Sequence, residues 1–170
     1  LRRVRSDSFG YTLEALVLTA LLALPGPLLF AALGSQLAGS AETTAFPKAA
    51  GQAAIAVSFG LFSLRFFSLL GINGGVADRH FRWSGSVLRV IRREFGWAVW
   101  LLMPTAFVVA LVYNDKDVAH TATLGRVALI LLMVGLTLFI ARLINPRRGV
   151  LQNLMRERPE GWISRLRNLW

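Results

Sequence analysis

Four long apolar stretches dominate this sequence and limit the folds it can adopt. They cover about 11–37, 49–72, 95–113 and 124–144, and each has the length of roughly 20 residues that a helix needs to cross a bilayer core. With 55% hydrophobic and 16% charged residues, the chain lacks the polar surface of a soluble domain. Membrane strands alternate polar and apolar residues, and these stretches do not. The sequence therefore predicts an all-α, polytopic membrane protein with four transmembrane helices, in one module over 1–170.

The arginines lie mostly on one side of these predicted spans. Fourteen precede the first span, separate the second from the third or follow the fourth, whereas the other side has only Lys48 and Lys116. Basic residues accumulate on the cytoplasmic side of membrane proteins, so both ends are expected in the cytoplasm. This topology also accounts for the net charge of +10, and no nucleic-acid partner is expected.

Two basic segments, about 78–93 and 147–170, are predicted to be interfacial amphipathic helices. At 100° per residue, four arginines of 78–93 share one face, opposite Val87, Val90 and Ile91. This pattern is typical of a helix in the headgroup plane with its apolar side in the acyl boundary, so membrane lipids are expected partners. The residues expected at the headgroups are Arg79, Arg82, Trp83, Arg89, Arg92, Arg93, Arg147, Arg148 and Trp162.

Prolines interrupt two of the predicted spans. Pro25, Gly26 and Pro27 predict a kink in the first span, because proline removes a backbone donor and clashes with the preceding turn. The kink is either a hinge that moves in function or a static bend that fits the helix to its neighbours. Pro104 in the third span allows the same two interpretations.

Four charged residues fall inside the predicted spans, where such groups are candidates for function: Glu14, Arg65, Arg126 and Arg142. Arg65 is near enough to the cytoplasmic end to extend toward it. Glu14 and Arg142 have similar depths, so a structural ion pair between them is possible. Arg126 lies at the outer edge of its span. None forms the series of acidic groups that a proton relay needs.

Other polar residues give weak signals for chemistry. Asp78 and His80 have no third polar group nearby for acid–base work. The loop with Asp115, Asp117 and His120 has too few donors for a stable metal site. There is no cysteine, and no cofactor, metal or enzymatic activity is expected. The small residues of Ala49–Ala54 predict a close helix contact.

Three blocks, "RRVRSDSFGYTLEALVLTALLALPGPLLFAALG", "GVADRHFRW" and "LGRVALILLMVGLTLFIARLINPRRGVL", resemble the inner-membrane domain of large MscS-like mechanosensitive channels of the KefA/MscK and YjeP type. The resemblance implies a bacterial inner-membrane protein, assembled as a heptamer, that responds to osmotic downshock. This chain would be an auxiliary, tension-sensing part of a longer polypeptide, upstream of the pore and with the rest of that polypeptide as partner. The alternatives are a structural or scaffold membrane subunit, a small transporter or a membrane-bound transferase.

Overall fold

The computed structural model describes residues 7–39, 44–72, 75–79, 83–115 and 121–145. Within these ranges the chain is helical and has no strand, which confirms the all-α class. The elements in chain order are α1 (Asp7–Ala23), α2 (Pro25–Gly39), α3 (Ala45–Leu70), α4 (Val76–Arg79), α5 (Gly85–Asp115), the π-helical turn η1 (Thr121–Gly125) and α7 (Arg126–Ile144).

Three helical stretches are long and apolar enough to cross a membrane: Ala45–Leu70, Gly85–Asp115 and Thr123–Ile144. A fourth span results if α1 and α2, which are bent by 46° at a short break, count as one. With 31 residues, α5 is about 46 Å long, well beyond a bilayer core of about 30 Å. The segment 78–93 was expected to form a separate interfacial helix. Its residues 85–93 instead form the first turns of α5.

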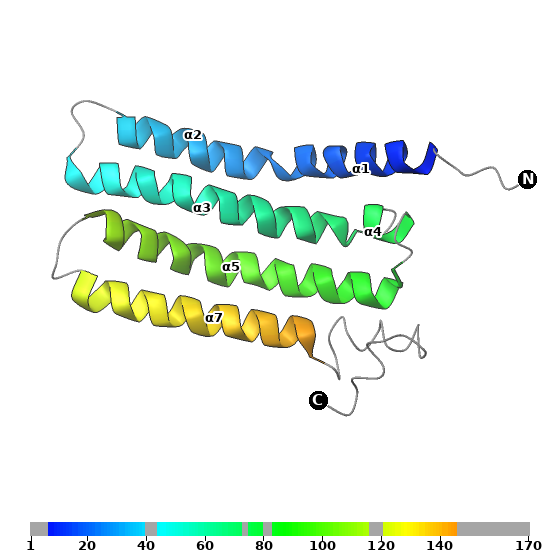
Figure 1. Ribbon diagram of the computed structural model, residues 1–170. Coiled ribbons are helices and arrows are strands. Elements are labelled where there is room, and N and C mark those ends of the chain that lie inside the picture. Colours follow the sequence, from blue (N-terminus) through cyan, green and yellow to red (C-terminus); the bar gives the residue numbers. More distant parts are fainter. Residues whose placement is uncertain (1–6, 40–43, 73–74, 80–82, 116–120, 146–170) are drawn as a thin grey trace, which may run out of the picture.

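The helices lie side by side in chain order, largely in one layer (Figure 1). The extensive contacts connect α2 with α3, α3 with α5, and α5 with α7. Helix α1 begins and α7 ends at the same end of the layer (Figure 1). In each of the three unbroken spans, no more than 22% of the most apolar window is buried within the chain. Most of the apolar surface therefore faces outward.

Helices α2 and α3 approach each other closely at two glycines. A Cβ on Gly34 would lie 2.6 Å from the carbonyl oxygen of Gly51, and a Cβ on Gly51 would lie 2.5 Å from that of Gly34. Ala49, Ala53 and Ala54 are buried beside this crossing. The small residues of Ala49–Ala54 thus lie at a close helix contact, as their sequence predicts.

Large apolar side chains connect α3, α5 and α7. Leu64, Ala98, Leu102 and Phe139 form the buried cluster that joins the three helices. The Phe95 ring lies between its neighbours, 5.6 Å from the centroid of Phe67 on α3 and 5.1 Å from that of Phe139 on α7. These tilted and edge-on contacts are favourable aromatic geometries.

Hydroxyl groups inside the spans bond to their own helices. Thr19 donates to the carbonyl of Ala15, and Thr137 donates to that of Met133. Among the described residues, no buried side-chain nitrogen or oxygen lacks a hydrogen-bond partner. Interhelical polar contacts are thus not needed to satisfy these groups in lipid, and the layer is held together mainly by packing.

Candidate functional site

The first candidate site is the break in the first span, at Leu24 between α1 and α2. Pro25 and Pro27 lack the N–H that an interior helix residue donates. Leu24 instead donates to the Leu21 carbonyl at 3.3 Å, and Leu28 donates to the Leu24 carbonyl at 2.9 Å. The 46° bend therefore falls at the predicted Pro25, Gly26 and Pro27 segment.

Arg65 of α3 lies against this break. A Cβ on Gly26 would be only 2.5 Å from Arg65 Nη1, so the missing side chain at Gly26 makes room for the guanidinium group. Gly26 is the second residue of α2, so the positive charge of Arg65 lies directly at the break between the two helices. The sequence indicated extension toward the surface for Arg65, without indicating this neighbour.

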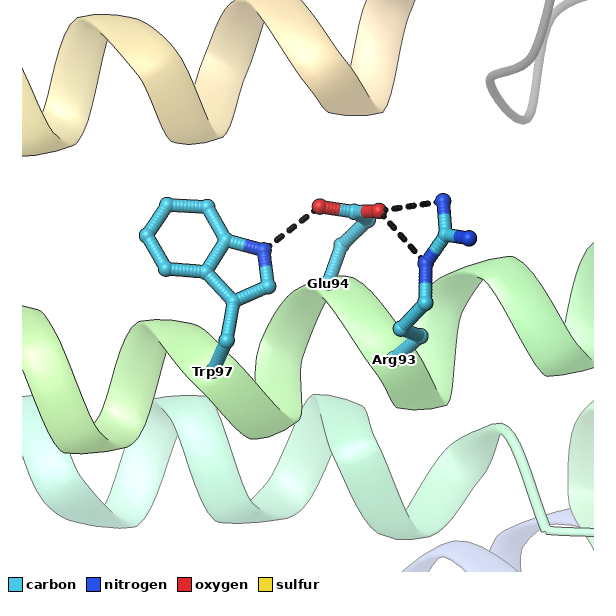
Figure 2. A network of polar contacts seen from close by, with 3 residues as sticks. All are labelled: Arg93, Glu94 and Trp97. Carbon is cyan, nitrogen blue, oxygen red and sulfur yellow. Dashed lines mark hydrogen bonds and ion pairs between the residues drawn. The ribbon is translucent and has the colours of Figure 1, made fainter.

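The second candidate site is a polar cluster around Glu94, near the start of α5. Figure 2 shows its carboxylate between Arg93 and Trp97. Glu94 Oε1 accepts hydrogen bonds from Arg93 Nε at 3.0 Å and Nη2 at 2.7 Å. The other oxygen, Oε2, accepts one from Trp97 Nε1 at 2.5 Å. Glu94 is 1% exposed, and these three bonds satisfy the charge that burial removes from water.

Helix α7 contributes Arg142 to the same cluster. Its guanidinium carbon lies 5.3 Å from the centroid of the Trp97 ring, in cation–π range. A cavity of about 440 Å³ is lined by Arg93, Glu94, Arg142 and Asn145. The cluster therefore combines two arginines from neighbouring helices with one buried carboxylate at an open polar cavity.

Glu94 is not among the residues predicted to be functional from the sequence. With the third span predicted at 95–113, this carboxylate counted as part of the preceding loop. The available signal was one acidic residue directly after a pair of arginines and three residues before Trp97, a spacing that puts Glu94 and Trp97 on one helix face. Burial by a neighbouring helix was not readable from that pattern.

The structure also corrects the predicted surroundings of the apolar face of 78–93. Val87 and Ile91 are buried within the protein rather than facing the acyl boundary. A Cβ on Gly71, at the end of α3, would lie 3.1 Å from Ile91 Cγ2. A helical wheel treats the segment as isolated and cannot distinguish lipid from another helix as the apolar partner.

The charged residues predicted inside the spans do not form one site. Glu14 lies on α1 and Arg142 on α7, at opposite edges of the layer (Figure 1), so the ion pair considered between them does not form. Arg126 is exposed at the start of α7. Pro104 lies inside α5, which continues through it without a break.

The other predicted interfacial residues are only partly described. Arg79 ends α4, Trp83 is half-buried, and Arg89 and Arg92 are exposed on α5. Four of them lie outside the described residues: Arg82, Arg147, Arg148 and Trp162. Contact of all these residues with headgroups stays a prediction.

Chemical motifs noted in the sequence have limited structural counterparts. Asp78 lies on α4 and Asp115 ends α5, whereas His80, Asp117 and His120 fall outside the described ranges. Across the described part of the chain, no three His, Cys, Asp or Glu residues come together in a group that could hold a metal ion.

An all-helical layer with three or four candidate spans defines a multi-pass membrane protein. The family model described as mechanosensitive ion channel inner membrane domain 1 matches residues 1–170. The chain belongs to this family, which is a channel family and not an enzyme family, and it is a membrane region related to mechanosensitive channels. Neither a curated protein nor a solved structure matches the chain.

Proposed function

We propose that this chain is an auxiliary, tension-sensing membrane region of a bacterial MscS-like channel that responds to osmotic downshock, and that the pore lies elsewhere in the complete protein. The observation that carries the proposal is the open helix layer, which leaves most of the apolar surface of each span facing outward. A layer of this kind exposes a large apolar area to lipid, so its free energy depends strongly on the thickness and area of the bilayer.

The break between α1 and α2 supplies the conformational variable. With 15 residues, α2 is about 22 Å long. The 46° bend shortens its projection along the α1 axis by about 7 Å. Hydrophobic mismatch costs fractions of a kcal/mol per Å, so straightening changes the fit to the bilayer by on the order of a few kcal/mol per chain. A stretched, thinner bilayer favours the bent form.

Packing within the helix layer couples the bend between α1 and α2 to the other helices. The Gly34–Gly51 crossing ties α2 to α3 through backbone contacts, and the ring contacts of Phe95 tie α3 to α5 and α7. A change in the tilt of α2 therefore moves α3, because packed helices shift as bodies rather than deform. Tension shifts the population toward whichever arrangement fits the stretched membrane.

The decisive experiment is patch-clamp recording of the complete protein, with Pro25→Ala combined with Pro27→Ala. The two alanines restore two amide donors and favour a straight helix, so the tension threshold should rise. Pro47→Ala is the matched control, since Pro47 lies in the first turn of α3, where no helix bond is lost. A threshold equal to that of the control would contradict the hinge.

A second variant tests the basic segment 78–93. Neutralising Arg82, Arg89 and Arg93 together removes the charges that would hold this end of the layer at the headgroups. We expect a shifted tension threshold with normal assembly. An unchanged threshold would refute a role for these arginines in sensing.

Orientation and assembly are part of the same proposal. The arginine distribution supports both ends of the chain in the cytoplasm, and the family resemblance supports a homo-oligomer, a heptamer. Ion flux through the complete protein under applied suction distinguishes this function from a scaffold subunit, a transporter or a transferase, none of which conducts in response to tension.

A further inference from the structure

Two cavities open near the start of α5 and share the Arg93 side chain, and the first of them is mainly polar. The first, about 440 Å³, is lined by Arg93, Glu94, Arg142 and Asn145. The second, about 400 Å³, is lined by Ser86, Arg89, Val90 and Arg93. Three guanidinium groups and one carboxylate therefore line these two neighbouring cavities.

Glu94 orients Arg93 without neutralising the cavity. All three hydrogen bonds of the carboxylate go to Arg93 and Trp97, through both of its oxygens. Arg93 uses two of its N–H groups for Glu94, which leaves three of the five donors of a guanidinium group. Its side chain is 69% exposed, so these donors are open to a ligand.

Arg142 faces the first cavity from the other helix. Its guanidinium carbon lies 5.3 Å from the centroid of the Trp97 ring, a cation–π contact that requires no hydrogen bond from the guanidinium donors. None of the described residues accepts a hydrogen bond from it. Two arginines held by one indole–carboxylate pair thus line one side of the first cavity.

We propose that this end of the layer binds one phosphate group between Arg93 and Arg142, with Glu94 and Trp97 as positioning residues. Two guanidinium charges and one carboxylate leave a net charge of +1, which a singly charged phosphodiester neutralises. Guanidinium groups suit phosphate oxygens because their paired donors match the spacing of those oxygens.

The depth of the cluster indicates the source of the phosphate. The uncharged stretch 95–113 is about 28 Å long as a helix, close to the thickness of a bilayer core. Arg93 and Glu94 directly precede it, so a span over 95–113 would place them at the level of the headgroups. The phosphate of an anionic phospholipid is therefore the expected ligand, with free inorganic phosphate as the other source of the same chemistry.

The test measures ligand-dependent thermal stabilisation of the complete protein in detergent. The probes are dioctanoyl phosphatidylglycerol, dioctanoyl phosphatidylcholine and inorganic phosphate. Phosphatidylglycerol should raise the unfolding midpoint saturably, and Arg93→Gln and Arg142→Gln should each weaken its apparent affinity about tenfold. Arg92→Gln and Arg126→Gln are the matched controls, on the same two helices and outside both cavities, with changes below about twofold.

Glu94→Gln separates positioning from simple attraction of an anion. The substitution removes a negative charge from the cavity, so electrostatics alone predicts tighter binding of phosphatidylglycerol. If Glu94 positions Arg93, binding instead weakens by about threefold or more, since the charge-assisted bonds to Arg93 are lost. Tighter binding by the folded variant overturns the positioning role.

The comparison of the three probes decides whether the bound phosphate belongs to a lipid or is free inorganic phosphate. Equal affinity for inorganic phosphate and phosphatidylglycerol, with the same dependence on Arg93 and Arg142, supports the phosphate site and overturns a lipid as its ligand. Equal affinity for phosphatidylcholine overturns the preference for an anionic lipid. Arg93→Gln and Arg142→Gln variants that bind like the controls overturn the site itself. Binding is measured without membrane tension, so the result for the phosphate site does not depend on whether the proposed sensing function is correct.

Discussion

The crossing of α2 and α3 makes a sharp prediction for Gly51→Ala. A Cβ at this position would lie 2.5 Å from the Gly34 carbonyl oxygen, 2.6 Å from the Ala38 amide nitrogen and 3.0 Å from the Ala38 Cβ. The first two of these atoms belong to the backbone, so no side-chain rotation relieves the overlap. The helices themselves must move apart.

The size of the effect follows from the required separation. Carbon–oxygen contacts between neighbouring backbones are about 3.3–3.6 Å, so α2 and α3 must separate by roughly 1 Å. A gap of this size forfeits a quarter to a half of the dispersion energy of each contact across the interface. Overpacking of this kind costs about 1–3 kcal/mol, and the rigid obstruction places Gly51→Ala toward the upper end.

The assay is thermal unfolding of the complete protein in detergent, compared with Gly39→Ala. Gly39 ends α2, and a Cβ there would meet nothing within 4 Å. We expect a clear drop in the unfolding midpoint for Gly51→Ala and little change for Gly39→Ala. Equal midpoints for the two variants would refute the backbone contact between α2 and α3.

A double variant checks the same reasoning in another way. Gly34→Ala alone should destabilise similarly, because its Cβ would lie 2.6 Å from the Gly51 carbonyl oxygen. One separation of the helices relieves both overlaps, so Gly34→Ala with Gly51→Ala should cost less than the sum of the single changes. Full additivity would indicate that the two sites do not share one interface.

Three further predictions concern packing and topology. Phe139→Ala removes a buried ring that joins α5 and α7, and unfolding in detergent should show a loss of about 1–3 kcal/mol, below the roughly 3–5 kcal/mol of a water-soluble core; wild-type stability would contradict this packing. Gly96→Ala, with open space around the new Cβ, should stabilise α5 by about 0.5–1 kcal/mol, and a lower unfolding midpoint would count against that open space. Because the chain has no cysteine, Ser40→Cys should react with an impermeant maleimide on intact spheroplasts and Ser6→Cys only after permeabilisation; the reverse pattern would invert the proposed orientation.

The class of fold and three of the four predicted spans were readable from the sequence, and the fourth depends on whether the bent pair α1 and α2 counts as one span. Each apolar stretch is long enough for a bilayer, and lipid leaves the backbone no other way to satisfy its hydrogen bonds than a helix or a closed barrel. The break at Leu24–Leu28 was equally readable, because the missing donors of Pro25 and Pro27 are a local property of the chain. The Ala49–Ala54 contact follows from side-chain size alone.

The tertiary structure decided which helix meets which surface. Lipid and the protein interior are both apolar, so hydropathy does not distinguish a residue that faces lipid from one that faces another helix. The sequence therefore could not assign Val87 and Ile91 to the protein interior. The same ambiguity hid Glu94, because its surroundings depend on Arg142, about 50 positions later in the chain. The sequence also left an ion pair between Glu14 and Arg142 open, which the helix order excludes because α1 and α7 lie at opposite edges of the layer. Charge and length are properties of each segment by itself, whereas the neighbours of a segment depend on how all helices pack together. For that reason the sequence by itself determined the class, the long apolar stretches and the break, and only the arrangement of the helices brought Arg93, Glu94, Trp97 and Arg142 together.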